Sequence, residues 1–174
     1  LFLGKDFSSP PSFVMQQNIY GRLEQTMSYG IIPLRKIDDE YMTPMYCLRD
    51  MLSYTKIGKE ETLWEPFHGD GGSGAKMKKL GYKVIECKDK DFFTTPPPED
   101  RSIIMVTNPP FSIKKEVLDH IINVQKWDRF AILIPAVTIH TRYFHKILEK
   151  RGDDMPVISL LFPHARIQFI KNGV

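Results

Sequence analysis

The sequence predicts an α/β fold in which a mainly parallel sheet carries helices on both faces. Three observations predict it. Residues 103–107 and 130–135 are continuous apolar runs, which are typical of parallel strands buried on both faces. Residues 62–65 form a shorter apolar run that leads into four glycines and then into a lysine-rich helix. Strands and helices that alternate in this order favour a doubly wound sheet.

Length and composition are those of one ordinary globular domain of 174 residues. The formal net charge of +3 is compatible with an anionic partner without demanding one. Cys47 and Cys87 lie far apart with no CxxC pair, so we expect neither a zinc site nor a disulfide framework. The sequence has no apolar run of about eighteen residues and no signal peptide, so we expect an intracellular protein, cytoplasmic or nuclear, without a membrane partner.

Residues 1–40 have no sustained hydrophobic period and predict an N-terminal arm with at most one helix, near residues 16–27. The domain proper is expected at residues 41–174. It should begin with a helix in which Thr43 is the N-cap and Pro44 the first residue. The apolar residues that follow at helical spacing are Met45, Leu48, Met51 and Leu52.

The glycine-rich loop after residues 62–65 favours a bound ligand. Glycine permits positive φ and a close approach to the backbone, and a helix N-terminus offers free N–H groups. The pattern GxxxxGK[ST] is missing, so a nucleoside triphosphate is not expected here. A helix at residues 76–80 should end at Gly81, followed by a strand at residues 82–86.

An acid at or just past the second strand of a doubly wound sheet often binds ribose hydroxyls. Two residues fit this position, Glu86 at the strand end and Asp89 three residues later, and the sequence does not choose between them. A stiff linker with three consecutive prolines, residues 96–98, then returns the chain to the strand at residues 103–107.

That strand delivers Asn108-Pro109-Pro110-Phe111 to the edge of the sheet. The two prolines hold the turn stiff and extended. The Asn108 carboxamide and the Pro109 carbonyl offer two acceptors beside the aromatic ring of Phe111. This arrangement suits a planar group that carries an amino function.

A helix capped by Ser112 should follow, with Lys114 and Lys115 in its first turn as candidate phosphate contacts. Its inward residues are expected to be Val117, Leu118, Ile121, Ile122 and Val124. After the strand at 130–135 we expect a helix near residues 142–150, with Phe144, Ile147 and Leu148 facing inward. Residues 156–162 and 165–170 predict the last two strands, joined by Pro163-His164.

Three of these stretches together resemble a known family: Asn108-Pro109-Pro110-Phe111, the glycine loop that follows Glu65-Pro66-Phe67, and Tyr41-x-Thr43-Pro44. They are similar to class I S-adenosylmethionine-dependent amino methyltransferases, in particular to compact, phage-like or virus-like adenine-N6 enzymes of the NPPF type. The resemblance covers residues 39–173. It implies a Rossmann-like sheet with an antiparallel terminal strand or hairpin, which residues 166–173 would open.

The resemblance also implies roles for single residues, with S-adenosylmethionine as the cofactor and no metal. Asn108, Pro109, Pro110 and Phe111 would form the catalytic site. The implied cofactor-binding residues are Tyr41, Thr43 and Pro44 as a cover, Glu65, Pro66, Phe67, Gly69 and Gly71 for the methionine moiety, Glu86 or Asp89 for the ribose, and Asp91 and Phe92 for the adenine. His140, Arg142 and Tyr143 would lie in a loop that contacts substrate.

The function that the resemblance implies is methyl transfer to the N6 amino group of adenine, in DNA rather than RNA. Related NPP[FY] sites also serve guanine N2 of ribosomal RNA and glutamine N5 of proteins. Because no separate target-recognition domain is evident, a partner subunit for target recognition is an option. RNA adenine methylation is the nearest alternative, and a non-catalytic nucleic-acid-binding or scaffold subunit with the same fold is the alternative from another class.

Overall fold

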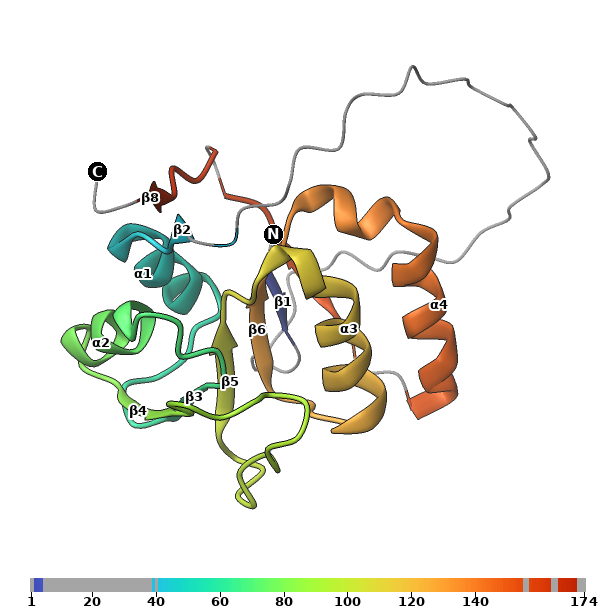
Figure 1. Cartoon of the computed structure of the whole chain (residues 1–174), viewed down its shortest axis with the longest axis horizontal. Helices are drawn as coiled ribbons and strands as arrows, with labels where there is room; N and C mark the ends of the chain where they lie inside the picture. Colours follow the sequence, from blue (N-terminus) through green and yellow to red (C-terminus); the bar gives the residue numbers. More distant parts are fainter. Residues whose placement is uncertain (1, 5–38, 40, 155–156, 164–165, 172–174) are drawn as a thin grey trace.

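The computed structural model describes residues 2–4, 39, 41–154, 157–163 and 166–171 (Figure 1). The strands are β1 (Phe2–Gly4), β2 (Tyr41–Met42), β3 (Thr62–Glu65), β4 (Lys83–Glu86), β5 (Ile104–Thr107), β6 (Phe130–Leu133), β7 (Ser159–Leu161) and β8 (Ile170–Lys171). The α-helices are α1 (Met45–Tyr54), α2 (Gly72–Lys79), α3 (Lys114–Asp119) and α4 (Arg142–Arg151). Short 3-10 helices are η1 (Phe111–Ile113), η3 (Ala136–His140) and η4 (Gly152–Asp154), and η2 (His120–Val124) is a π-helical turn.

The central sheet has six strands in the order β4-β3-β5-β6-β1-β7. Its first four strands are parallel neighbours, as the sequence predicted for the apolar runs. Trp64 lies between Ile85 of β4 and Met105 of β5 in the register. The chain crosses from β3 to β4 on one side and returns to β5 on the other side of β3, so the winding of the sheet reverses between β3 and β5.

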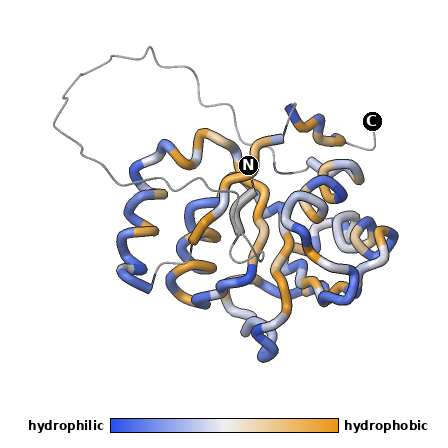
Figure 2. Tube along the Cα trace, turned by 180° about the vertical axis from the view of Figure 1, so that it is seen from behind, coloured by the Kyte–Doolittle hydropathy of each residue, from blue (hydrophilic) through white to orange (hydrophobic). Residues whose placement is uncertain are grey.

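Each face of the sheet packs against its own hydrophobic core because successive side chains of a strand point to opposite faces. On β5, Ile104 and Val106 pack with α1 and α2, whereas Met105 packs with α3 and α4. Figure 1 shows α1 and α2 on one side of β5 and α3 and α4 on the other. The hydrophobic residues follow the central strands in Figure 2. The described part of the chain is therefore a three-layer α/β/α structure, compatible with a Rossmann-like fold.

The position of β1 was not predicted from the sequence. Residues 2–4, within the segment expected to be an arm, form a strand that is antiparallel to both β6 and β7. The sheet does contain an antiparallel strand, but it comes from the N-terminal end. The C-terminal segment that was expected to open a hairpin instead pairs Ile170 with Met42 and Lys171 with Tyr41, in a separate sheet of β2 and β8. The expected helix near residues 16–27 lies outside the described residues.

Several predicted helix starts were wrong. The N-cap of α1 is Pro44 rather than Thr43, and its first residue is Met45. Ser112 is not a helix cap either, because the chain after Phe111 first makes η1 and only then α3. The predicted core residue Val124 is 61% exposed, since the helix widens into the π-helical turn η2 before it ends.

The remaining elements lie close to their predicted places. The helix α2 begins at Gly72, four residues earlier than expected, and Gly81 beyond its end has a φ of +90°. Thr141 caps α4 by accepting a hydrogen bond from the Phe144 amide at 3.3 Å. The last strands are shorter than predicted, and residues 156, 164 and 165 of that region lie outside the described part.

None of the helices among the described residues is long and apolar enough to cross a membrane.

Candidate functional site

A cavity of about 550 Å³ lies at the carboxyl ends of β3 and β5, where the winding of the sheet reverses. Doubly wound sheets bind ligands at this place because the loops there diverge and leave a crevice. Its volume is within the range of small-molecule sites, about 300–1,000 Å³. The lining residues are Asp39, Tyr41, Met42, Thr43, Pro66, Phe67, His68, Gly69, Asp70, Ser73, Cys87, Asp89, Lys90, Asp91, Phe92, Asn108, Pro109, Pro110, Phe111 and Phe169.

The structure brings most of the predicted site residues to this one cavity. All four residues of the NPPF stretch line it, and so do Tyr41, Thr43, Pro66, Phe67, Gly69, Asp89, Asp91 and Phe92. Four predicted cofactor residues do not: Pro44, Glu65, Gly71 and Glu86. The candidate substrate residues His140, Arg142 and Tyr143 do not line it either. The roles of the residues that do line the cavity remain predictions.

Asn108 lies directly after β5, with its side chain partly buried in the cavity wall. Its amide nitrogen Nδ2 donates a hydrogen bond of 2.9 Å to Oγ1 of Thr43. Its oxygen Oδ1 is buried and has no hydrogen-bond partner among the described residues. Buried polar atoms are normally paired, since an unpaired one costs about 1–3 kcal/mol. The Asn108 carboxamide therefore has an unsatisfied acceptor in the wall of the cavity.

The turn after Asn108 is held by contacts with two distant segments. The Pro110 carbonyl accepts from the Ile113 amide at 3.3 Å, which closes η1. Ser112 donates from both its amide and its hydroxyl to the Asp39 carboxylate. The ring of Phe111 packs edge to face on Phe169, with centroids 5.9 Å apart. The aromatic face predicted for this turn is thus part of a two-ring wall.

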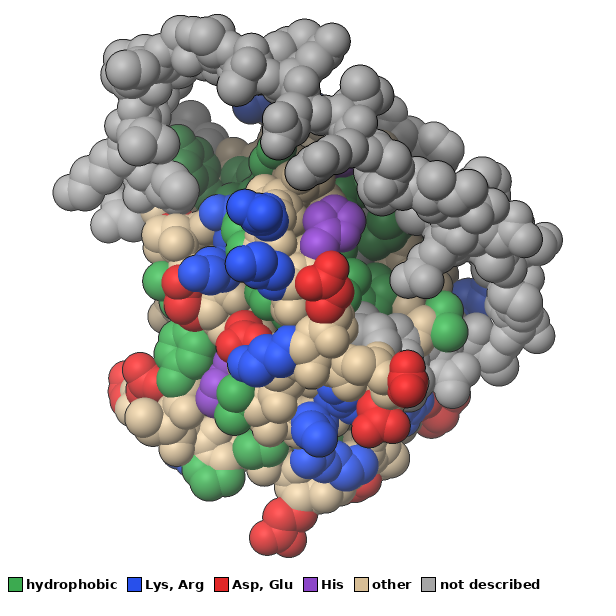
Figure 3. Space-filling model, turned by 90° about the vertical axis from the view of Figure 1, so that its right-hand side faces the viewer, with side chains coloured by type: hydrophobic (Ala, Val, Ile, Leu, Met, Phe, Trp, Pro, Cys, Tyr) green, Lys and Arg blue, Asp and Glu red, His purple; other side chains and the backbone are tan. Residues whose placement is uncertain are grey.

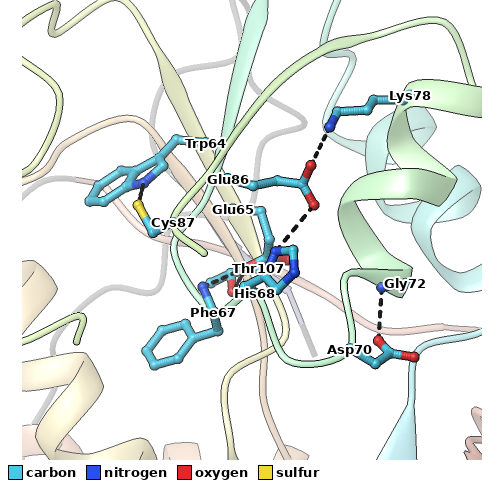
Figure 4. A network of polar contacts seen from close by, with 10 residues as sticks. All are labelled: Trp64, Glu65, Phe67, His68, Asp70, Gly72, Lys78, Glu86, Cys87 and Thr107. Atoms are coloured by element: carbon cyan, nitrogen blue, oxygen red, sulfur yellow. Dashed lines mark hydrogen bonds and ion pairs between the residues drawn. The ribbon is translucent and has the colours of Figure 1, made fainter. Parts of the chain in front are cut away.

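The glycine-rich loop folds into a tight turn at the N-terminus of α2 (Figure 4). Gly69 and Gly71 have φ values of +53° and +77°, which side chains rarely adopt. The Gly71 amide donates to the His68 carbonyl at 2.7 Å, and the Asp70 carboxylate accepts from the Gly72 amide at 2.8 Å. Asp70 therefore occupies one of the helix N–H groups that a ligand would otherwise meet.

Glu65 lies at the end of β3 but faces β5 instead of the cavity. Its carboxylate oxygen Oε1 accepts from the Thr107 hydroxyl at 2.5 Å and from the Phe67 amide at 3.1 Å (Figure 4). The residue is 1% exposed, and burial raises its pKa from 4.5 to about 8 although the two hydrogen bonds oppose the rise. Glu65 therefore connects the ends of β3 and β5 and does not line the cavity, and its role toward a cofactor stays a prediction.

The structure separates the two candidate acids for a ribose. Glu86 points to α2, where its carboxylate binds Lys78 Nζ, and its Oε1 lies 3.5 Å from His68 Nδ1 (Figure 4). Asp89 lines the cavity in a left-handed backbone conformation, φ +54°. Of the two acids, only Asp89 lines the cavity, and the assignment of the ribose to either acid stays a prediction.

Asp91 and Phe92 form the far wall of the cavity. The Asp91 oxygen Oδ1 accepts from the amides of Phe93 at 2.7 Å and Thr94 at 3.1 Å, which holds the loop in a compact turn. Phe92 packs on Phe67 with ring centroids 4.7 Å apart and also contacts His120 at 5.1 Å. Burial lowers the pKa of His120. The second oxygen of Asp91 has no such intraloop bond and can accept from a ligand.

Sequence reasoning missed several residues of the cavity. Phe169 is 58 residues from Phe111 along the chain, and no periodic pattern connects the two. His68 and Cys87 were passed over because the prediction followed the glycines and the acids around them. Cys87 Sγ accepts from the Trp64 indole N–H at 3.2 Å and so sits where β3 and β4 meet the cavity. The sequence does show an acid, Asp39, close to Tyr41, but it gives no indication that this acid contacts Ser112.

The described residues contain no group of three or more His, Cys, Asp or Glu side chains that could hold a metal ion. Comparisons with models of known protein families, with curated proteins and with solved structures found no match. The fold and the cavity therefore carry the functional argument.

Proposed function

We propose that this chain is an S-adenosylmethionine-dependent methyltransferase that acts on the N6 amino group of adenine in DNA. One observation carries the proposal: a single cavity is lined both by the turn at Gly69 and by all four residues of the NPPF stretch, with the Asn108 Oδ1 acceptor left without a partner among the described residues. A methyl donor and a target amine must meet in one cavity, and these two stretches are the ones expected to bind them.

The residues present fit the cofactor. Phe67, Gly69 and the adjoining turn would lie along its methionine moiety, Asp89 would accept from its ribose hydroxyls, and Asp91 with Phe92 would bind its adenine. When bound, S-adenosylmethionine supplies an electrophilic methyl group. Glu65 does not take part directly in this arrangement, since it joins β3 to β5 behind the loop.

On the target side, the lone pair of an aryl amine is delocalised into its ring and is a poor nucleophile. Asn108 Oδ1 and the Pro109 carbonyl would accept from the two N–H groups and favour a tetrahedral nitrogen that is ready to attack. Phe111 and Phe169 would pack against the base, and stacking on aromatic side chains is worth about 1–3 kcal/mol per base. A base in a duplex would first have to flip out, at a cost of a few kcal/mol.

Contacts with phosphates are proposed near the cavity. Lys90 lines it, and Lys115 is exposed in the first turn of α3, directly after η1. Lys114 is a weaker candidate than expected because its Nζ donates to the Phe111 carbonyl at 2.9 Å. On the face that carries α4, groups of basic side chains have acidic side chains beside them, so we propose no phosphate contacts there (Figure 3).

The test is methyl transfer from radiolabelled S-adenosylmethionine to separate pools of DNA, RNA and protein, followed by digestion and identification of the methylated product. We expect N6-methyladenine in DNA. Label in RNA would move the proposal to its nearest alternative, and label in protein would refute the nucleobase. Asn108→Ala should reduce transfer at least about 100-fold, because removal of one oriented group at a reacting centre typically has this effect.

A second candidate function is a non-catalytic nucleic-acid-binding or scaffold subunit. One observation favours it: the carboxylates of Glu65 and Glu86 do not line the cavity but contact other residues of the protein. The two candidates differ in a simple way: a scaffold would bind nucleic acid with no transfer to any pool, and Asn108→Ala would leave that binding unchanged.

A further inference from the structure

We propose that Thr43 is a positioning residue that holds the Asn108 carboxamide in place in the catalytic turn. The inference deepens the proposed function and rests on it, because orientation matters to activity only if Asn108 accepts from a target amine. The resemblance assigns Thr43 to the cofactor, whereas its contacts connect it with the catalytic turn.

A carboxamide has a donor NH2 group and an acceptor oxygen. It can accept a hydrogen bond from a target amine only if the oxygen faces that amine. Thr43 is 2% exposed, and its Oγ1 accepts from Asn108 Nδ2 at 2.9 Å. This bond satisfies the donor end of the amide and leaves Oδ1, the acceptor end, without a partner among the described residues. With the opposite orientation, the amide would present N–H groups to the N–H groups of an amine.

Thr43 is itself held from two sides. Its carbonyl oxygen accepts from Lys76 Nζ at 2.8 Å, which connects it to α2, the helix that follows the glycine turn. On the other side Pro44, the N-cap of α1, has φ −68° and ψ 152°, which places Thr43 just outside the helix. Thr43 thus joins the helix of the glycine turn to the catalytic turn, and these contacts fix the backbone from which its hydroxyl reaches Asn108.

The decisive variant is Thr43→Val, which keeps the shape of the side chain and removes the acceptor for Asn108 Nδ2. We expect kcat for methyl transfer to fall about 10–100-fold, because the amide loses the bond that holds it in place, while KM for S-adenosylmethionine changes less than threefold. Thr43→Ser keeps the hydroxyl and should restore kcat to within about threefold of the wild type. A Thr43→Val enzyme with wild-type kcat, or a Thr43→Ser enzyme as slow as Thr43→Val, would overturn the proposal.

Thr55→Val is the matched control. Thr55 is also 2% exposed and lies at the other end of α1, where its hydroxyl donates to the Met51 carbonyl at 2.7 Å and to the Leu52 carbonyl at 3.3 Å, contacts that the substitution removes. It does not line the cavity. Thr55→Val should lower the free energy of unfolding, because a buried hydrogen bond is lost, and leave kcat unchanged. An equal loss of kcat in Thr55→Val would mean that the effect at Thr43 is general destabilisation.

A second measurement separates this inference from the proposed function. The side-chain amide protons of Asn108, assigned by NMR through the signals lost in Asn108→Asp, should exchange with solvent at least about tenfold more slowly in the wild type and in Thr43→Ser than in Thr43→Val. Equal exchange rates in all three proteins would contradict the proposed bond. If the wild type transfers no methyl group to any pool, the proposed function fails, and the exchange rates alone still decide the role of Thr43.

Discussion

Glu65 illustrates how the environment of one residue can override its expected chemistry. At the end of a strand beside a glycine turn, a carboxylate is a natural ligand for a cationic group. Here the strand geometry turns it toward Thr107, and burial raises its pKa to about 8. The residue type and its position could be predicted from the sequence, but the direction of the side chain depends on β5, which lies 39 residues further along the chain.

The raised pKa of Glu65 makes stability depend on pH. Between pH 4.5 and pH 8 the folded state keeps the proton that the unfolded state releases, so the free energy of unfolding falls as pH rises, by roughly 1 kcal/mol per pH unit from this group. Glu65→Gln should remove this slope, because glutamine is neutral throughout. Urea denaturation at pH 5, 6, 7 and 8 measures it. Parallel slopes for the two proteins would show that Glu65 is ionised in the folded state.

Phe169 carries a second prediction at the residue scale. It completes an aromatic wall with Phe111, so Phe169→Ala should raise KM for nucleic acid about 5–100-fold and leave the affinity for S-adenosylmethionine within about twofold. The matched control is Phe162→Ala, because Phe162 is exposed in the same C-terminal region and does not line the cavity. Equal effects of the two substitutions on KM would exclude Phe169 from the binding of the base.

At the scale of elements, the strands and the order of helices were predictable, whereas the helix starts were not. Strands β3, β5 and β6 were expected from short apolar stretches that precede turn or glycine signals, a pattern typical of buried strands. Thr43 and Ser112 were expected as N-caps because hydroxyl residues before a helix usually fill that role. Both hydroxyls instead bond to distant segments, to Asn108 and to Asp39. Local propensity cannot foresee a partner that only the tertiary fold brings near.

The glycine turn contains two residues with positive φ, Gly69 and Gly71. Gly71 has φ +77° at the N-cap of α2, so Gly71→Ala should lower the free energy of unfolding by about 1–2 kcal/mol through backbone strain. Asparagine tolerates this conformation better, so Gly71→Asn, which adds a Cβ in the same place, should cost less. Urea denaturation of the three proteins compares them. If alanine and asparagine cost the same, contact with the His68 ring, 3.1 Å from the added Cβ, is the cause instead of φ.

For the whole molecule, the sequence predicted a mainly parallel α/β sheet, and the resemblance implied an antiparallel strand or hairpin at the C-terminal end, whereas the antiparallel strand of the sheet is β1. Three residues carry too short a pattern to be recognised as a strand, and nothing local indicates that they pair with β6 and β7. The cavity was predictable in outline because both of its main stretches follow parallel strands, whose carboxyl ends share one edge of the sheet. The resemblance also led us to expect Tyr41 and Thr43 at the cavity, whereas the contribution of Phe169 was not expected.

The insertion of β1 between two strands gives a prediction for the whole fold. Proline cannot donate to a neighbouring strand and is poorly tolerated inside a sheet, so Leu3→Pro should destabilise the protein by about 3 kcal/mol or more. Leu3→Val keeps the amide and suits a strand, so it should be nearly neutral. Thermal unfolding followed by circular dichroism distinguishes them. A Leu3→Pro protein as stable as Leu3→Val would show that β1 contributes little to the sheet.

The central claim is that the cavity between the Gly69 turn and Asn108 holds a methyl donor, and calorimetric titration with S-adenosylmethionine tests it most directly. We expect one molecule to bind per chain, with Asn108→Ala retaining an affinity within about threefold, since its carboxamide serves the target amine. Absence of binding to the folded protein, at concentrations up to about 1 mM, which corresponds to a binding free energy of only about 4 kcal/mol, would contradict the account.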